Sequence, residues 1–248
     1  LRPDEHQLRF VDVPTTKIHA KFRTEYVYRP EWGSITSFLD VSAAHLEDNR
    51  NFYRLDRLGA STPEFGALPS TTAALLQTLD TPNSYDSRHN SLDGTLGARC
   101  TIWLGGKLPN QHITFTPTVN GSIERLTYRR DALHAHPRRN QLFFLPTLSW
   151  GFDNCHIIYR MHAAYPELLN LLDYTDNADP LNLYYGNPHL QRSTSHKVTF
   201  SRSWWKWKEG KKFFIDVTWD VTRNAVAHGQ TYDAATGVRT FMPRNVDG

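Results

Sequence analysis

Hydrophobic and polar residues alternate with a period of two along most of the chain. The clearest run is 213–221, with Phe213 and Trp219 at odd-numbered positions and Asp216 and Asp220 at even-numbered positions. Below, each of the two alternating sets of positions is called a parity. Successive side chains of a β-strand point to opposite faces, so this run predicts a strand with one apolar and one polar face. Similar runs recur near 17–29, 34–44, 91–104, 113–123, 142–150, 156–163 and 197–201. The sequence therefore predicts an all-β chain of about eight strands, most near the ~9–11 residues that a tilted strand needs to cross a bilayer.

The connections between these strands alternate between short and long. This alternation is typical of outer-membrane barrels, which have short periplasmic turns and long external loops. We therefore predict an antiparallel up-and-down meander of transmembrane strands, part of a larger outer-membrane β-barrel, with the whole chain, 1–248, as one partial barrel domain. The short turns are expected at 30–33, 105–110, 151–154 and 208–211, and the long external loops at about 45–88, 129–139, 165–193 and 225–248.

Two features disturb the strand pattern. Pro117 and Pro146 fall inside runs that otherwise read as strands, and each proline removes a backbone donor from the sheet. They are expected to mark bulges or strand ends. The segment 166–172 has helical spacing, and we expect a short helical turn inside a loop there.

Composition restricts the function classes. A net charge of +3 with scattered basic residues argues against a nucleic-acid partner, which usually requires a clustered basic face. Cys100 and Cys155 match no zinc or redox spacing. No apolar run reaches the ~18 residues of a membrane helix, whereas barrel strands expose only every second side chain to lipid. The chain begins at Leu1 without a signal peptide, so we expect a segment of a longer protein.

Three segments in the second half of the chain carry a family resemblance. The run 179–190 and the later segment with Asp233, Gly237, Arg239 and Thr240 resemble motifs of TonB-dependent receptor-type outer-membrane barrels, as does the strand 145–150. The family's Lys-Pro-Glu is replaced by Gln191, Arg192 and Ser193. Glycine and proline also suit a turn, so we expect the motif to be structural. Its residues are Asp179, Pro180, Leu181, Gly186, Asn187, Pro188 and Leu190.

The resemblance implies a function and a location. Such barrels have 22 strands around a plug domain, and they import a scarce nutrient across the bacterial outer membrane with energy from an inner-membrane partner. That energy-coupling protein would act through an N-terminal region that this sequence does not include. The resemblance also implies contact with the lipid bilayer and lipopolysaccharide, and a small nutrient as substrate. The substrate itself is not identified by the sequence.

Several side chains have competing interpretations. Trp204, Trp205 and Trp207 could stack on a sugar, but next to a short turn we favour an aromatic girdle at the membrane interface. His134 and His136 lack further metal ligands at a suggestive spacing, so we expect a polar loop. The polar parity supplies candidate residues of the barrel lumen, among them Arg23, Glu25, Arg99, Arg160, Asp216 and Asp220.

No motif for catalysis or cofactor binding is present, so we expect neither an enzyme nor a bound cofactor. Asp216 and Asp220 could form a carboxylate pair for acid–base chemistry, but solvated and salt-bridged lumen residues are the favoured interpretation. Two alternatives remain open. One is a structural or adhesive outer-membrane barrel without transport, and the other is a soluble β-sandwich that binds carbohydrate through its tryptophans.

Overall fold

A computed structural model describes residues 8–105 and 110–247, without the side chains of Ala60, Lys206 and Trp207. Within these residues the fold is all-β, with 66% of the chain in strands and one short α-helix, α1 (Thr72–Gln77). In this part of the chain no helix is both long enough and apolar enough to span a membrane. The predicted all-β class is therefore confirmed.

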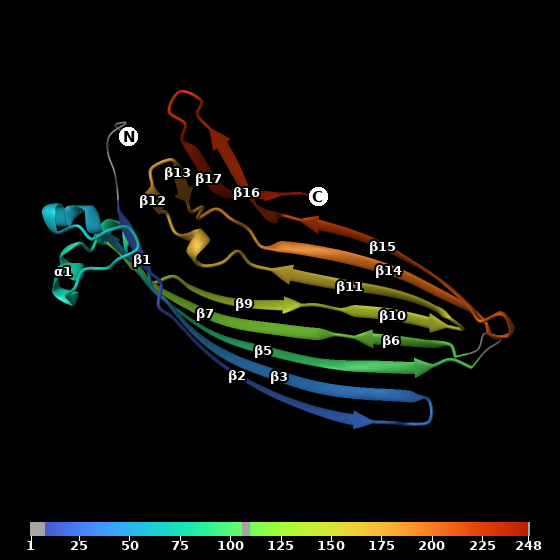
Figure 1. Cartoon of the computed structure of the whole chain (residues 1–248). Helices are drawn as coiled ribbons and strands as arrows, with labels where there is room; N and C mark the ends of the chain where they lie inside the picture. Colours follow the sequence, from blue (N-terminus) through green and yellow to red (C-terminus); the bar gives the residue numbers. More distant parts are fainter. Residues whose placement is uncertain (1–7, 106–109, 248) are drawn as a thin grey trace.

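Eleven strands form one curved sheet, called the main sheet below (Figure 1). Its strands pair antiparallel and lie side by side in chain order, as a meander requires. β6 and β7 follow one another along a single line of the sheet, as do β9 and β10, so eight strand lines cross it. The strands are β2 (Thr15–Tyr28), β3 (Gly33–Asp48), β5 (Asp86–Trp103), β6 (His112–Thr116), β7 (Thr118–Arg130), β8 (Leu133–Ala135), β9 (Arg138–Phe144), β10 (Thr147–Phe152), β11 (Cys155–Ala164), β14 (Ser193–Lys206) and β15 (Lys211–Arg223).

The two prolines interrupt neighbouring strand lines at the same level. Pro117 separates β6 from β7, and Pro146 lies between β9 and β10. Their carbonyl groups still accept hydrogen bonds, from the backbone N–H groups of Ala98 at 3.2 Å and Met161 at 3.3 Å. Each proline therefore costs only the one donor that it lacks, and the sheet continues on both sides. The expectation of strand ends at these positions is confirmed.

Short and long connections gather at opposite ends of the main sheet, called the turn end and the loop end (Figure 1). At the turn end, the β2–β3 turn closes with a hydrogen bond from the N–H of Gly33 to the carbonyl of Pro30. Asp153 and Gly210 reverse the chain there with positive φ angles of 49° and 62°. Part of the expected turn 105–110 lies outside the described residues. The predicted segregation of turns from loops otherwise agrees with the structure.

The long connections contain more regular structure than we expected. The segment 129–139 is a tight hairpin rather than a loop, because Asp131 adopts a positive φ and lets Arg130 pair with Leu133. The segment after residue 225 forms two strands of a separate four-stranded sheet. The other loop-end elements are β1 (Arg9–Asp12), β4 (Asn51–Arg54), η1 (Leu55–Ser61), η2 (Thr81–Asn83), η3 (Leu169–Leu171), β12 (Thr175–Asp179), β13 (Asn182–Tyr185), β16 (Ala225–Tyr232) and β17 (Arg239–Val246).

A hydrophobic core lies at the loop end. Leu168 and Leu172, which flank the 3₁₀ turn η3, are buried against Leu126 and Tyr128 of β7. The predicted helical turn in 166–172 is thus present, and its leucines explain the helical spacing. Phe52, Tyr53 and Leu55 are also buried in this region, on β4 and at the start of η1.

The main sheet does not close on itself within the described residues. β2 and β15 are its two edges, and neither pairs with a further strand on its outer side. Every residue of β2 is exposed, as expected for an edge with free backbone groups. The observed fold is therefore an open antiparallel meander.

Candidate functional site

One face of the main sheet is apolar and exposed. Its strand register joins residues into continuous rows that cross all eight strand lines. Large side chains on this face remain open, such as Leu96 and Trp219 at 61% and Leu142 at 71% exposure. One row consists of Tyr28, Ile35, Cys100, Phe115, Leu148, Tyr159, Val198 and Trp219. The predicted alternation thus produces a coherent apolar surface and not merely isolated apolar side chains.

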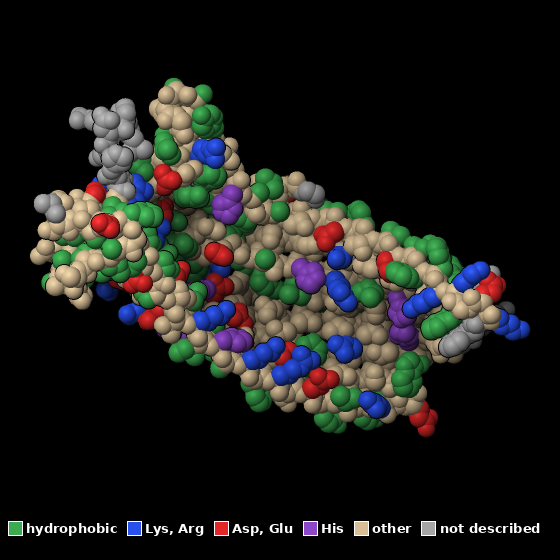
Figure 2. All heavy atoms as spheres, in the orientation of Figure 1, with side chains coloured by type: hydrophobic (Ala, Val, Ile, Leu, Met, Phe, Trp, Pro, Cys, Tyr) green, Lys and Arg blue, Asp and Glu red, His purple; other side chains and the backbone are tan. Residues whose placement is uncertain are grey.

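The opposite, polar face holds all the named candidate lumen residues, which are Arg23, Glu25, Arg99, Arg160, Asp216 and Asp220. Arg160 pairs with Thr147 and Lys197, and Lys197 pairs with Asp220, so these side chains form one polar row. Arg99 lies on the same face of β5, opposite Thr36. Figure 2 shows Lys, Arg, Asp, Glu and His side chains spread over this face.

Asp216 belongs to a neighbouring polar row nearer the turn end. It pairs with Ser201, which pairs with His156 of β11. The rings of His112 and His156 lie 6.0 Å apart across Gly151, which has no side chain to separate them. Asp220 instead accepts a hydrogen bond from the Ser195 hydroxyl at 2.7 Å. The two carboxylates are therefore in different surroundings.

A cleft of about 410 Å³ lies on the polar face at the loop end. Its floor comes from the polar parity of β3, β5, β7 and β9, and its roof is the segment 165–169 that leads into η3. This size falls within the range of small-molecule sites. The floor residues are Leu46, Asp48, Ser87, His89, Ser91, Asp93, Glu124, Leu126 and Arg139, and the roof residues are Tyr165, Glu167, Leu168 and Leu169.

A buried ion pair joins the floor of the cleft to its roof. Glu124 accepts hydrogen bonds from the Nη2 of Arg139 at 2.7 Å and the Nε2 of Gln141 at 2.6 Å. The same guanidinium donates to the carbonyl of Pro166 and stacks on the Tyr165 ring, 5.0 Å from its centroid. Both partners of the pair are largely buried, which strengthens their interaction. Arg139 thus fixes the roof segment against the sheet.

Sequence reasoning did not single out the charged residues of this cleft. The alternation places Ser91 and Asp93 on the polar parity of β5, and extending it by two residues adds His89. The same extension along β7 reaches Glu124. That the roof lies over them could not be predicted, because it depends on where a distant loop packs.

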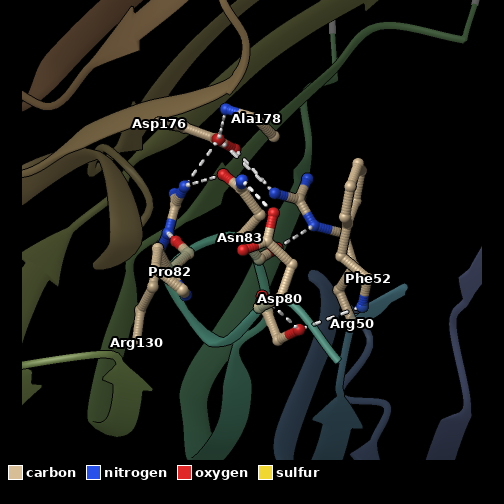
Figure 3. A network of polar contacts seen from close by, with 9 residues as sticks. Arg50, Phe52, Asp80, Pro82, Asn83, Arg130, Asp176 and Ala178 are labelled. Atoms are coloured by element: carbon tan, nitrogen blue, oxygen red, sulfur yellow. Dashed lines mark hydrogen bonds and ion pairs between the residues drawn. The ribbon is translucent and has the colours of Figure 1, made fainter. Parts of the chain in front are cut away.

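A second polar cluster fixes the loops to one another (Figure 3). Asp176 of β12 binds Arg130 at 2.9 Å and Arg50 at 3.3 Å. Arg130 also donates to the carbonyl of Pro82 at 2.7 Å and to the side chain of Asn83. Three segments far apart in the sequence therefore meet at one carboxylate.

The pKa of Asp176 is lowered in this cluster. Burial alone would raise it, but the backbone N–H of Ala178 and the charges of Arg130 and Arg50 outweigh the burial. The carboxylate stays ionised at neutral pH, and the side chain of Arg130, only 5% exposed, has a partner for its charge.

The residues of the family-like motif form turns and connections. Asp179 accepts hydrogen bonds from the N–H of Leu181 at 3.0 Å and the side chain of Asn182 at 2.7 Å, which closes the β12–β13 turn. Asn187 donates to the carbonyl of Pro243 at 2.9 Å. Gly186 approaches the backbone of Leu172 so closely that a side chain would collide with it.

The two family-like segments lie side by side. The N–H of Arg239 donates to the carbonyl of Leu181 at 2.8 Å, and β13 and β17 form a parallel pair. Asn245 bonds to the backbone of Gln191 in both directions, at 2.8 and 3.0 Å. Pro180, Pro188 and Leu190 lie on the same connection, between β12 and β14. In the structure, the motif residues form turns and strand contacts at the loop end.

The tryptophans do not form one stacking platform. Trp204 lies opposite Phe213 on the apolar face, with the guanidinium of Arg202 4.6 Å from its ring centroid. Trp205 points to the other face, where the Nζ of Lys212 is 5.6 Å from its ring. The side chain of Trp207 lies outside the described residues. A flat sugar-binding surface made by both described tryptophans is therefore excluded by their opposite directions.

The two histidines near β8 are both exposed. His134 is on β8 and His136 follows it. Across the described ranges, no cluster of three or more His, Cys, Asp or Glu side chains is arranged to hold a metal ion.

Comparison with known proteins adds no family assignment. No protein-family model matches the chain, and no curated protein matches it in a sequence search. The functional interpretation therefore depends on the geometry and on the motif resemblance.

Proposed function

We propose that this chain forms part of the wall of an outer-membrane transport barrel, with its apolar face toward lipid and its polar face toward a lumen. The observation that carries the proposal is the exposed apolar face, which is continuous across eight strand lines. In water such a surface would be a strong aggregation liability. Against acyl chains it is the expected surface of a barrel wall.

The height of the apolar surface supports the proposal. On β5 the apolar parity extends from Leu92 to Ile102, and on β15 from Phe213 to Val221. These spans correspond to the ~9–11 residues of a tilted transmembrane strand. Toward the loop end the same parity becomes polar in the row of His45, Asn90, Arg125 and Arg138. A band with a polar border is what a bilayer of fixed thickness requires.

The two free edges require further strands. Unpaired backbone N–H and C=O groups are very unfavourable in lipid, so β2 and β15 would pair with the rest of a larger barrel. The family resemblance implies 22 strands, of which eight are roughly a third. Trp204 near the turn end would lie at the membrane interface, with Arg202 beside it, whereas Trp205 and Lys212 would face the lumen.

The loop end would then face the outside of the cell. There the ordered loops would contact lipopolysaccharide and capture a small nutrient, which would pass along the polar face. The inner-membrane energy-coupling protein would act through the plug region implied by the resemblance. No catalytic step is part of this proposal.

Fractionation of the native full-length protein tests the proposal. We expect the protein in the outer-membrane fraction, with a band that migrates differently before and after boiling. A soluble protein without a heat shift would contradict the membrane assignment and favour the soluble carbohydrate-binding alternative. An outer-membrane barrel whose deletion leaves nutrient uptake unchanged would instead favour a structural or adhesive role.

A further inference from the structure

The cleft under the segment 165–169 has an unbalanced charge. Four carboxylates line it, from Asp48, Asp93, Glu124 and Glu167, against the single guanidinium of Arg139. Glu124 and Arg139 neutralise each other at 2.7 Å. The remaining three carboxylates give the cleft a negative potential, which partial enclosure by protein strengthens.

Two of these carboxylates have no partner of their own. Among the described residues, Asp93 and Glu167 form neither a hydrogen bond nor an ion pair with their side chains. Asp48 accepts only a hydroxyl hydrogen bond, from Thr15 at 3.3 Å. Carboxylates of a structural network, such as Asp176, are instead saturated by arginines. The unpaired carboxylates of the cleft therefore differ from Asp176, whose charge is paired in the second polar cluster.

Buried polar atoms without a hydrogen bond lie in the cleft lining and next to it. The Nε2 of His89 and the Nε of Arg139 belong to lining residues, and the Oγ of Ser122 and the Oε1 of Gln141 belong to residues beside the floor. The Nε2 of His89 lies 3.6 Å from a carboxylate oxygen of Glu124, whereas Ser122 has no such neighbour among the described residues. Ser122 is only 5% exposed and pairs in the sheet with both Asp93 and Gln141. Leaving a buried polar atom unsatisfied is costly, so the Ser122 hydroxyl beside Asp93 indicates a place where a polar group of another molecule can bind.

The rest of the lining restricts the ligand further. Four leucines, at positions 46, 126, 168 and 169, contribute apolar surface beside the carboxylates. No three ligating side chains in the described ranges are grouped for a metal ion. The lining therefore suits an organic cation, with a charged head for the carboxylates and a short aliphatic body for the leucines.

We propose that this cleft binds small organic cations bearing an ammonium or guanidinium group. The inference rests on the proposed function, in which the polar face lines the solute path, and it names the substrate class of that path. Asp93 on the floor and Glu167 at the roof are the two charge-recognition residues. Arg139 is a positioning residue, because it neutralises Glu124 and holds the roof in place.

Binding to the purified full-length protein in detergent tests the inference. The probe is 1,5-diaminopentane, measured by titration calorimetry in low salt, with 1,5-pentanediol and glutarate as neutral and anionic molecules of similar length. We expect the diamine to bind, the diol to bind at least about tenfold more weakly, and glutarate not to bind. Added salt should weaken diamine binding, because screening acts on a partly open site.

Three isosteric variants locate the site. Asp93→Asn and Glu167→Gln should each weaken diamine binding roughly five- to tenfold, because each removes one charge-assisted contact. Asp86→Asn is the matched control, since it removes an exposed carboxylate from the same strand as Asp93 but outside the cleft lining, and it should bind as the unmodified protein does. The cleft assignment is wrong if glutarate binds as well as the diamine, if no diamine binds, or if the control variant alone loses binding.

The heat shift of every variant separates this inference from the proposed function. A folded outer-membrane protein that does not bind the diamine would overturn only the cation site. A protein without a heat shift or outer-membrane location would overturn the barrel assignment as well.

Discussion

The main sheet and the loop end place their large apolar side chains in opposite ways. The loop end buries its large apolar side chains, as Leu168 at 4% and Leu126 at 5% exposure show. The main sheet leaves side chains of the same type open, with Leu142 at 71% and Leu96 at 61%. The same residue type, leucine, is therefore buried in one region and exposed in the other.

The two regions also differ in how charges are used. At the loop end, Arg130 and Arg50 converge on Asp176 and connect distant segments. On the polar face of the main sheet, charged residues such as Arg99, Arg160 and Asp216 are exposed to solvent. Removing one partner of a buried ion pair is strongly destabilising, whereas exposed charges contribute little to stability.

The largest effect should come from breaking the buried charge cluster. Arg130→Met leaves the carboxylate of Asp176 without its closest partner, and removing one partner of a buried pair costs about 3–5 kcal/mol. Arg129→Met, which changes an exposed neighbour, should cost less than about 0.5 kcal/mol. Urea unfolding of the full-length protein, followed by protease sensitivity of the loops, measures both variants. Equal sensitivity of the two would show that the cluster does not hold the loops.

The next largest effect should come from the loop-end core. Leu168→Ala removes a buried side chain that packs on β7, which costs about 2–4 kcal/mol. Leu76→Ala, at a position with 57% exposure on α1, should cost less than about 1 kcal/mol. The free energy of unfolding again provides the measurement. A large loss at Leu76 would indicate that α1 packs on something beyond the described residues.

Consecutive residues of β15 test the two faces of the main sheet directly. Val217→Arg places a charge on the apolar face and should destabilise the protein in lipid vesicles by about 2–3 kcal/mol. Thr218→Arg places it on the polar face, where the cost should stay below about 1 kcal/mol. If both variants unfold at the same urea concentration in vesicles, the apolar face does not contact lipid.

The smallest effect should be a loosening of the loops in acid. Because the pKa of Asp176 is lowered in the folded protein, its ion pairs stabilise the fold above the pKa of the unfolded state and are lost as the pH falls through the folded pKa. Amide hydrogen exchange in 175–185 should therefore rise in strongly acidic solution and not near neutral pH. In Asp176→Asn this exchange should already be raised at pH 7 and should change less with acid.

The sequence alone was sufficient to predict the strands of the main sheet and the two faces of these strands. A period of two is a local property, because each strand residue points to the face opposite its neighbour, whatever the rest of the fold does. For this reason the alternation around Trp219 and Asp220 predicted the strands, their two faces and the side on which Arg99, Arg160 and Asp216 lie. Pro117 and Pro146 marked the strand breaks for the same local reason, the missing backbone donor.

Only the tertiary structure decided how the loops are arranged. Arg50 and Asp176 are 126 residues apart in the chain, and Arg130 and Asp176 are 46 apart, so no local sequence pattern predicts their contact. The same is true of the cleft, whose floor follows from strand parity while its roof depends on Leu168 and Leu172 packing on β7. Such contacts depend on the sum of many distant packing energies, whereas the direction of a strand side chain is determined by the backbone at a single residue.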